Sequence, residues 1–291
     1  MSRLSDRYWK IKCTQIDGDF RFWEDIDFEA KVHKSIQKEP NKSDITIFNL
    51  NAESRAFFSE DGATIEVIAG YKSQDLNGRL LKAQIDIITN KRDGVEWETK
   101  IIARDGAKTT RNAKIEKTFA AGTDNKAIMN ALIQILTSPP VVKVSKRTKT
   151  APAKKNNVVP LIKGNIDLST VSGKLAKART LKGLAIDYYA EFCRSFNLRF
   201  QVNDGTLHTV KSNFSIMDEV IILDSESGLI GVPENTETGW KFKSLLRFDL
   251  EPGQKVRVKS SVLSSDILMT DVTHDAKTQG EWLTEIEGII I

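Results

Sequence analysis

The sequence is poor in the residues from which metal and cofactor sites are built. Its 291 residues include only three histidines and two cysteines. The histidines, His33, His208 and His274, are distant from one another and from Cys13 and Cys193. Zinc sites need such ligands at close, characteristic spacings. We therefore expect neither a metal site nor a bound cofactor.

The common catalytic and nucleotide-binding motifs are missing as well. There is no Gly-x-x-x-x-Gly-Lys-Ser/Thr loop, no Gly-x-Gly-x-x-Gly and no Gly-x-Ser-x-Gly. One local cluster, Asp271, His274 and Asp275, has the side chains of acid–base catalysis, but a polar turn between strands explains it fully. Carboxylate pairs such as Glu285 and Glu287 alternate like solvated strand faces. We expect no enzyme.

No apolar run approaches the length of about 18 residues that a transmembrane helix needs. The first seven residues, Met-Ser-Arg-Leu-Ser-Asp-Arg, lack the apolar core of a signal peptide. We expect synthesis in a reducing cytoplasm and no membrane-spanning segment. Cys13 and Cys193 each lie in an apolar pattern, which favours two buried free thiols over a disulfide.

Charge is nearly balanced over the whole chain but not along it. There are 43 basic and 39 acidic residues, a formal net charge of +4, which predicts neither nucleic-acid nor membrane binding. Residues 141–164 contain cations, two prolines and no acidic residue, which is typical of a linker or surface loop. A solvated loop, a polyanion contact and docking to an acidic neighbour all remain open. The candidate contacts are Lys143, Lys146, Arg147, Lys149, Lys154 and Lys155.

Residues 1–106 are predicted to form an antiparallel β-barrel domain. Apolar and polar residues alternate, as in Ile26, Phe28, Ala30 and Val32, which predicts strands with one buried face. Asp-Gly and Asn-Gly dipeptides between the strands favour hairpin turns. Closure of the barrel would remove exposed strand edges. A single helical segment, residues 52–58, is expected after an Asn51 cap.

The middle, residues 107–198, is predicted to be a helical or α+β region that includes the basic, proline-containing loop 138–164. Apolar spacing predicts an amphipathic helix over 124–136, capped by Thr123 or Asp124. A second helix is predicted from about 172 or 180 to 195. Its apolar stripe is expected to pack in the core, and it comprises Leu181, Leu184, Ala185, Tyr188, Phe192 and Phe196.

Residues 199–291 are predicted to form a second β-barrel domain. The segment 228–233 reads as a tight loop, and 239–246 as a partly buried strand. Pro252-Gly253 fits a type II turn, after which Val256 and Val258 resume the alternation. This pattern predicts a hairpin with an elaborate loop. The expected fold class is mainly β with an α+β middle: two small antiparallel β-barrel domains flanking a helix-containing insert.

The order and spacing of several short motifs resemble those of tailed-phage tail hub, or baseplate hub, proteins. The C-terminal motifs are Gly-Leu-Ile-Gly-x-Pro from Gly228, Gly-x-x-Phe-x-x-Leu-Leu from Gly239 and Pro-Gly-x-x-Val-x-Val from Pro252. The N-terminal ones are residues 28–32, 39–51, 69–71 and 103–106. The resemblance covers about the first 110 and the last 90 residues, and the middle departs from the family.

The resemblance implies a structural role in the virion tail. Such hubs look like homotrimers whose two barrel domains per chain alternate in a pseudo-six-fold ring. The ring joins the six-fold tail tube to a three-fold spike or tail tip, contacts other baseplate proteins and surrounds the DNA conduit. Leu229, Ile230, Val232 and Pro233 are our candidate inter-subunit or partner contacts; alternatively they fold back onto their own barrel.

Two other functions remain open. An OB-like nucleic-acid-binding protein with a basic arm would stack bases on exposed aromatic side chains, for which the candidates are Trp9, Phe20, Phe22, Trp23 and Trp97. A tail-associated peptidoglycan hydrolase is the third reading, although no segment resembles a lysozyme active site. Transient, non-specific contact with DNA fits the hub as well, through its basic loop.

Overall fold

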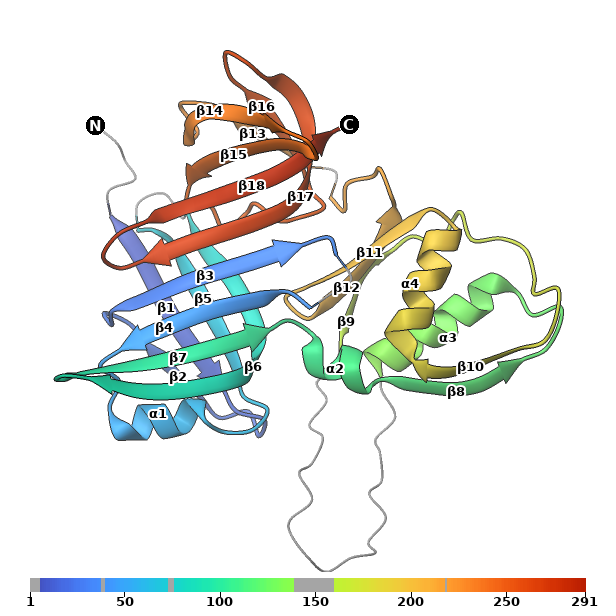
Figure 1. The fold of residues 1–291 in the computed structure, drawn as a ribbon, viewed down its shortest axis with the longest axis horizontal. Helices are drawn as coiled ribbons and strands as arrows, with labels where there is room; N and C mark the ends of the chain where they lie inside the picture. The colour runs from blue at the N-terminus through green and yellow to red at the C-terminus, as the bar shows by residue number, and fades with distance from the viewer. Residues whose placement is uncertain (1–5, 38–39, 73–75, 139–159, 218) are drawn as a thin grey trace, which may run out of the picture.

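A computed structural model describes residues 6–37, 40–72, 76–138, 160–217 and 219–291 (Figure 1). The N-terminal part is β-rich with one short helix. Its elements are β1 (Arg7–Thr14), β2 (Phe20–Trp23), β3 (Phe28–Ser35), β4 (Lys42–Phe48), α1 (Ala52–Phe58), β5 (Thr64–Tyr71), β6 (Asn77–Asp93) and β7 (Glu96–Arg104). Asn51 caps α1 as predicted, because its side-chain oxygen accepts a 2.7 Å hydrogen bond from Ser54 N.

The middle part holds the other helices and two small sheets. Its elements are α2 (Ala107–Asn112), β8 (Lys114–Phe119), α3 (Asn125–Thr137), β9 (Ile162–Ile166), β10 (Arg179–Leu184), α4 (Ala185–Ser195), β11 (Leu198–Asn203) and β12 (Thr206–Lys211). Asp124 caps α3, as expected. The second helix starts later than predicted, because residues 179–184 pair with β8 along their whole length as β10. Within its predicted stripe, Leu181, Ala185 and Phe192 are buried.

The C-terminal part is again made of strands. They are β13 (Val220–Leu223), β14 (Leu229–Thr236), β15 (Gly239–Leu245), β16 (Lys255–Lys259), β17 (Ser264–Lys277) and β18 (Trp282–Ile290). Most of the predicted 228–233 loop belongs to β14, but only Leu229 and Ile230 of it pair with β15, and residues 231–233 form an irregular stretch. The turn at Pro252-Gly253 is confirmed by a positive φ of 84° at Gly253 and by the bond from Gln254 N to Glu251 O.

One antiparallel junction merges the two β-rich parts into a single sheet. The second half of β17 pairs with β3, from Asp271 opposite Ser35 to Lys277 opposite Glu29. The resulting thirteen-stranded sheet runs in the order β14-β15-β18-β17-β3-β4-β7-β6-β5-β1-β2, with β16 paired to the first half of β17 and β13 paired to β16. The mainly-β prediction is confirmed. Among the described strands no pairing closes either half into a barrel, because β3 and β17 satisfy each other's edges instead.

Buried apolar residues form three clusters. One lies in the N-terminal part around Phe28 and Phe58 and includes Trp282 from β18. The second fills the middle, where Tyr189 and Met129 are fully buried. The third lies under the C-terminal strands. Strands β11 and β12 fall, apart from Leu198, in the predicted C-terminal domain 199–291 but contribute to the middle cluster. The division at 106 and 198 stays a prediction.

The two β-rich parts repeat one strand arrangement. In the first, chain order β3-β4-β5-β6-β7 gives the spatial order β3-β4-β7-β6-β5; in the second, chain order β14-β15-β16-β17-β18 gives β14-β15-β18-β17-β16. All these neighbours are antiparallel. The long strands in the fourth position, β6 and β17, both carry a register shift near their middle. The two β-rich parts therefore share both the order of their strands and a register shift in the corresponding strand.

Candidate functional site

The predicted contact residues lie at the end of the thirteen-stranded sheet. β14 is the terminal strand of the order given above, and its partner among the described strands is β15 alone. Ile230 and Val232 are 42% and 57% exposed, whereas Pro233 is buried and Leu229 half-buried. Two of the four side chains are thus available on the molecular surface at a free strand edge. Their role as contacts stays a prediction.

A second free edge lies on β6. Its first half pairs with β5 as far as Gln84, and beyond the register shift its second half, from Ile87 to Asp93, pairs among the described strands with β7 only. All of its side chains from Thr89 to Asp93 are exposed. An unpaired row of backbone donors and acceptors is a template for another strand. Sequence reasoning missed this edge, because alternation shows where a strand runs but not where its pairing stops.

Exposed aromatic side chains gather at the opposite end of the sheet, on β2. Phe20 and Phe22 are 51% and 45% exposed, and their rings lie 5.3 Å apart. The ammonium group of Lys10 lies 3.9 Å from the centre of the Phe22 ring, and Lys12 lies near both rings. Of the aromatic candidates, Trp9 and Trp23 instead pack against the N-terminal core. This edge therefore combines aromatic and cationic surface.

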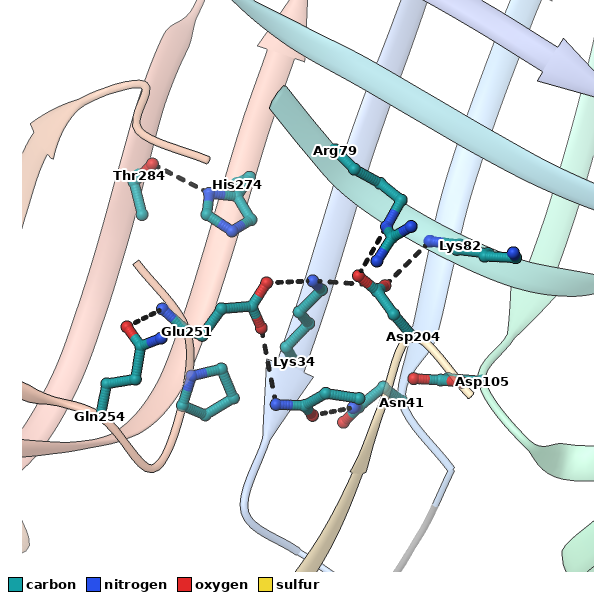
Figure 2. A network of polar contacts seen from close by, with 12 residues as sticks. Lys34, Asn41, Arg79, Lys82, Asp105, Asp204, Glu251, Gln254, His274 and Thr284 are labelled. Carbon is teal, nitrogen blue, oxygen red and sulfur yellow. Dashed lines mark hydrogen bonds and ion pairs between the residues drawn. The ribbon is translucent and has the colours of Figure 1, made fainter. Parts of the chain in front are cut away.

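A buried ionic network joins the three parts of the chain (Figure 2). Lys34, at the end of β3, is 1% exposed, and its Nζ lies 2.6 Å from Glu251 Oε1 and 3.4 Å from Asp204 Oδ1. Asp204 lies in the β11–β12 turn and Glu251 in the loop before β16. Arg79 of β6 donates from Nε to Asp204 Oδ2 at 3.1 Å. One lysine thus connects carboxylates from the middle and C-terminal parts.

Burial controls the protonation of this network. It works against the charge of Lys34, but Glu251 and Asp204 outweigh it and raise the lysine pKa. Burial raises the pKa of Glu251, while Lys34 opposes that shift. Asp105 is fully buried near Asp204, and burial followed by the Asp204 charge raises its pKa to about 8. Its Oδ1 accepts a 2.6 Å bond from Gly205 N. At neutral pH Asp105 is therefore mainly protonated.

The sequence does carry a signal for this network. Phe28, Ala30 and Val32 of β3 point to the buried face, and Lys34 is the next residue of that alternation. A lysine at an inward position needs a buried partner, because an unpaired buried charge is very costly. The partners, however, follow Lys34 by about 170 and 217 residues along the chain. Local sequence patterns could not identify them.

The acid–base candidates on β17 do not converge. His274 is fully buried, and its Nδ1 lies 3.0 Å from Thr284 Oγ1. Burial, followed by the Lys34 charge, lowers its pKa to about 3, so the imidazole is neutral. Asp271 instead faces His33 at 3.4 Å, and burial raises the pKa of Asp275. His274 faces the buried side of β17, whereas Asp271 and Asp275 lie on the opposite side, four residues apart, so the three side chains share no site.

The basic candidates from Lys143 to Lys155 lie outside the described residues. The free state predicted for the cysteines is confirmed, and Cys13 and Cys193 are both buried. Within the described ranges, no three His, Cys, Asp or Glu residues are placed to hold a metal ion. No helix in that part of the chain is both long enough and apolar enough to cross a membrane.

Comparisons with known proteins locate the fold. No family model matches the sequence, and no curated protein matches it. Among solved structures, the 43 kDa tail protein of prophage MuSo2 from Shewanella oneidensis is 10% identical, with a TM-score of 0.64 and 98% of each chain covered. A tail protein from Neisseria meningitidis is 10% identical, with a TM-score of 0.61 and coverage of 97% and 96%.

A third similar structure comes from a secretion system. It is an E. coli component of the type VI secretion system, described as similar to the T4 tail proteins gp27 and gp5. It is 12% identical with a TM-score of 0.58, and the match covers 92% of this chain and 74% of that one. The structural likeness thus extends through the middle region, where the sequence resemblance was weakest. Over nearly its whole length, this chain has the fold of phage tail proteins and of a type VI secretion component.

Proposed function

We propose that this protein is a structural hub of a phage tail or of a related injection apparatus. The observation that carries the proposal is the repeated five-strand arrangement within a chain whose fold extends over whole tail proteins. Two similar modules per chain let three copies present six similar lobes, while the assembly of the three copies keeps three-fold symmetry. A homotrimeric ring of this kind joins six-fold and three-fold structures.

The proposed neighbours follow from that symmetry. One face of the ring meets the six-fold tail tube, and the other meets a three-fold spike or tail tip and further baseplate proteins. The ring surrounds the DNA conduit, so contact with DNA is transient and non-specific. The protein is made in the host cytoplasm and resides in the virion tail. Its work is done by interfaces, and we propose no catalytic step.

Native mass spectrometry of the purified chain tests this proposal, first alone and then with its neighbouring tail proteins. We expect a trimer, and a complex in which trimers bind the tube protein on one side and the spike or tip protein on the other. A chain that stays monomeric and binds neither neighbour contradicts the proposal. Ring-shaped particles with three-fold averages in negative-stain electron microscopy provide a second, independent measurement.

The exposed aromatic pair on β2 supports a second candidate, single-stranded nucleic-acid binding. Phe20 and Phe22 are half-exposed, with Lys10 and Lys12 above them, and bases stack on such rings within positive surfaces. Glu24 lies 2.8 Å from Lys10 and neutralises part of that charge. Fluorescence anisotropy with a labelled oligonucleotide at low and high salt decides between the candidates: tight, salt-sensitive binding that Phe22→Ala abolishes favours this second function.

A further inference from the structure

We call the pairing between the long strand of one module and the first strand of another module a joint. The repeated arrangement contains one joint that is formed within the chain, the filled joint, and one whose two strands are unpaired among the described strands, the open joint. Within the chain, the second half of β17 is filled by β3. By the repeat, β6 corresponds to β17 and β14 corresponds to β3. The second half of β6 and the outer edge of β14 are both unpaired among the described strands. The chain therefore carries both halves of a second joint, located on different parts of its surface.

We propose that β14 of one copy adds to the second half of β6 of the next copy, antiparallel, as β3 adds to β17 within each chain. This inference rests on the proposed ring and assigns the strands that form its subunit contacts. The occupant of each free edge is a second copy of this chain. Because the two edges differ, the contact is head-to-tail, the type that generates closed rings or open filaments. A trimer then contains six joints, three filled joints within the chains and three open joints that are closed between neighbouring chains.

The register shifts align the receiving strands. Opposite β7, the pairing of β6 shifts between Ile85 and Ile87, and opposite β18, the pairing of β17 shifts between Met269 and Asp271. Ile87 therefore corresponds to Asp271. In both strands the half before the shift is paired on both sides. The half after the shift receives β3 in the case of β17 and, in the case of β6, has no second partner among the described strands. The bulge is thus the point at which each long strand leaves its own module.

The added strands align through their hairpin partners. Ser43 of β4 pairs with the β7 residue that lies opposite the start of the register shift in β6. Trp240 of β15 pairs with the β18 residue that lies opposite the start of the register shift in β17. Ser43 and Trp240 are therefore equivalent. Lys31 of β3 pairs with the residue after Ser43, and Glu234 of β14 pairs with the residue after Trp240. Glu234 therefore corresponds to Lys31.

Charge supports the register that this alignment predicts. In the filled joint, Asp275 lies opposite Lys31. Lys91 lies as far beyond its shift as Asp275 does, so the open joint places Lys91 opposite Glu234. Each joint thus pairs one acidic with one basic residue, with the signs exchanged. Both Lys91 and Glu234 are exposed, and opposite charges across a strand pair are stabilising.

The irregular middle of β14 limits the length of this joint. Ile230 and Val232 are exposed on β14, and in this register they lie opposite the end of β6 and the turn that follows it. Pro233, which has no N–H to donate, lies inside the irregular stretch between Ile230 and Glu234, where the ladder is already interrupted. The irregularity therefore leaves residues 234–236 as the regular part of the strand that is offered to the neighbour.

Disulfide trapping tests the joint directly. Residues opposite each other in antiparallel strands have Cα atoms about 4.5–5.5 Å apart, within the range that a disulfide spans. We expect the Lys91→Cys/Glu234→Cys double variant to give covalent dimers and trimers on mild oxidation, and either single variant to give no trimer. The native cysteines do not compete, since Cys13 and Cys193 are buried. Arg21→Cys/Glu234→Cys, which tests the β2 edge instead, is expected to give no oligomer.

Charge exchange gives a measurement that does not depend on cysteine chemistry. Lys91→Glu is expected to weaken self-association by about tenfold, because it faces Glu234 with a like charge. Adding Glu234→Lys is expected to restore it. Sedimentation velocity measures both. The control is Lys42→Glu, which changes an exposed lysine at the start of β4, a strand that lies between β3 and β7, and it should leave association unchanged.

The outcomes separate this inference from the hub proposal. If the wild-type chain forms trimers while the Lys91/Glu234 cysteine pair does not cross-link, the ring stands and the joint assigned here is wrong. Cross-linking through Arg21 also overturns it. If neither self-association nor binding to tail proteins is found, both proposals fail.

Discussion

Replacing Lys34 by methionine removes the charge at the centre of the buried network and keeps a side chain of similar length. Lys34 is the described cation nearest to Glu251, at 2.6 Å. Without it, Glu251 keeps a 3.5 Å bond from Asn203 Nδ2 and the charge of Arg79, whereas Asp204 keeps its ion pair with Arg79. Breaking a buried pair by removing one partner costs about 3–5 kcal/mol, because it leaves an uncompensated charge. We expect a loss of that size at pH 8.

The loss should depend on pH and on the remaining carboxylate. Burial raises the pKa of Glu251, and without Lys34 it rises further, so the carboxyl takes up a proton more easily as the pH falls. The cost of Lys34→Met should therefore be smaller at pH 5 than at pH 8. Adding Glu251→Gln, which is neutral at every pH, should recover a large part of the loss at pH 8.

Urea unfolding followed by both tryptophan fluorescence and far-ultraviolet circular dichroism measures these changes, and coincidence of the two probes tests for a single transition. Lys42→Met is the matched control. Its Nζ lies 3.0 Å from Asp44, but the side chains are 47% and 55% exposed, so a change within about 0.5 kcal/mol is expected. A loss below about 1 kcal/mol for Lys34→Met, or no recovery with Glu251→Gln, would refute the reasoning.

Three further predictions concern other residues. The pKa of Asp105 in the folded protein, about 8, lies above its usual value of 3.8, so its contribution to stability falls as the pH rises from about 4 to 8, by at most about 1.4 kcal/mol per pH unit. Urea titrations should show that the free energy of unfolding of Asp105→Asn increases relative to that of the wild type over this range. Parallel stability curves for the two proteins would contradict this prediction. Burial raises the pKa of Cys13 and Cys193 to about 12, so neither should react with a thiol reagent until guanidinium unfolds the chain; rapid labelling of the native protein would count against it. Gly239→Ala should destabilise the protein by about 1–3 kcal/mol or more, since φ is +145° and a Cβ would lie 2.2 Å from Gly288 O. Gly94→Ala, which has open space around it, should cost less in the same thermal or urea assay.

The fate of the sequence predictions follows from the range of the interactions behind them. Asn51 and Asp124 cap their helices through bonds to residues two or three positions away, and such local contacts are legible in a sequence. The second helix was placed too early, because residues 179–184 look helical in their apolar spacing but pair with β8, about 65 residues earlier. No sequence prediction concerned Lys34, although it interrupts the alternation of β3, and its partners lie far along the chain.

The sequence by itself determined that the chain is mainly β, where most strands run, which of their faces are buried and that both thiols are apolar core groups. These properties follow from the two-residue period of a strand and from local turns and caps. Only the tertiary structure decided that β3 pairs with β17 rather than closing a barrel, and that one edge of β14 and of the second half of β6 has no partner among the described strands. Backbone hydrogen bonds are the same for every residue pair, so the choice of partner strand depends on packing between segments far apart in the chain.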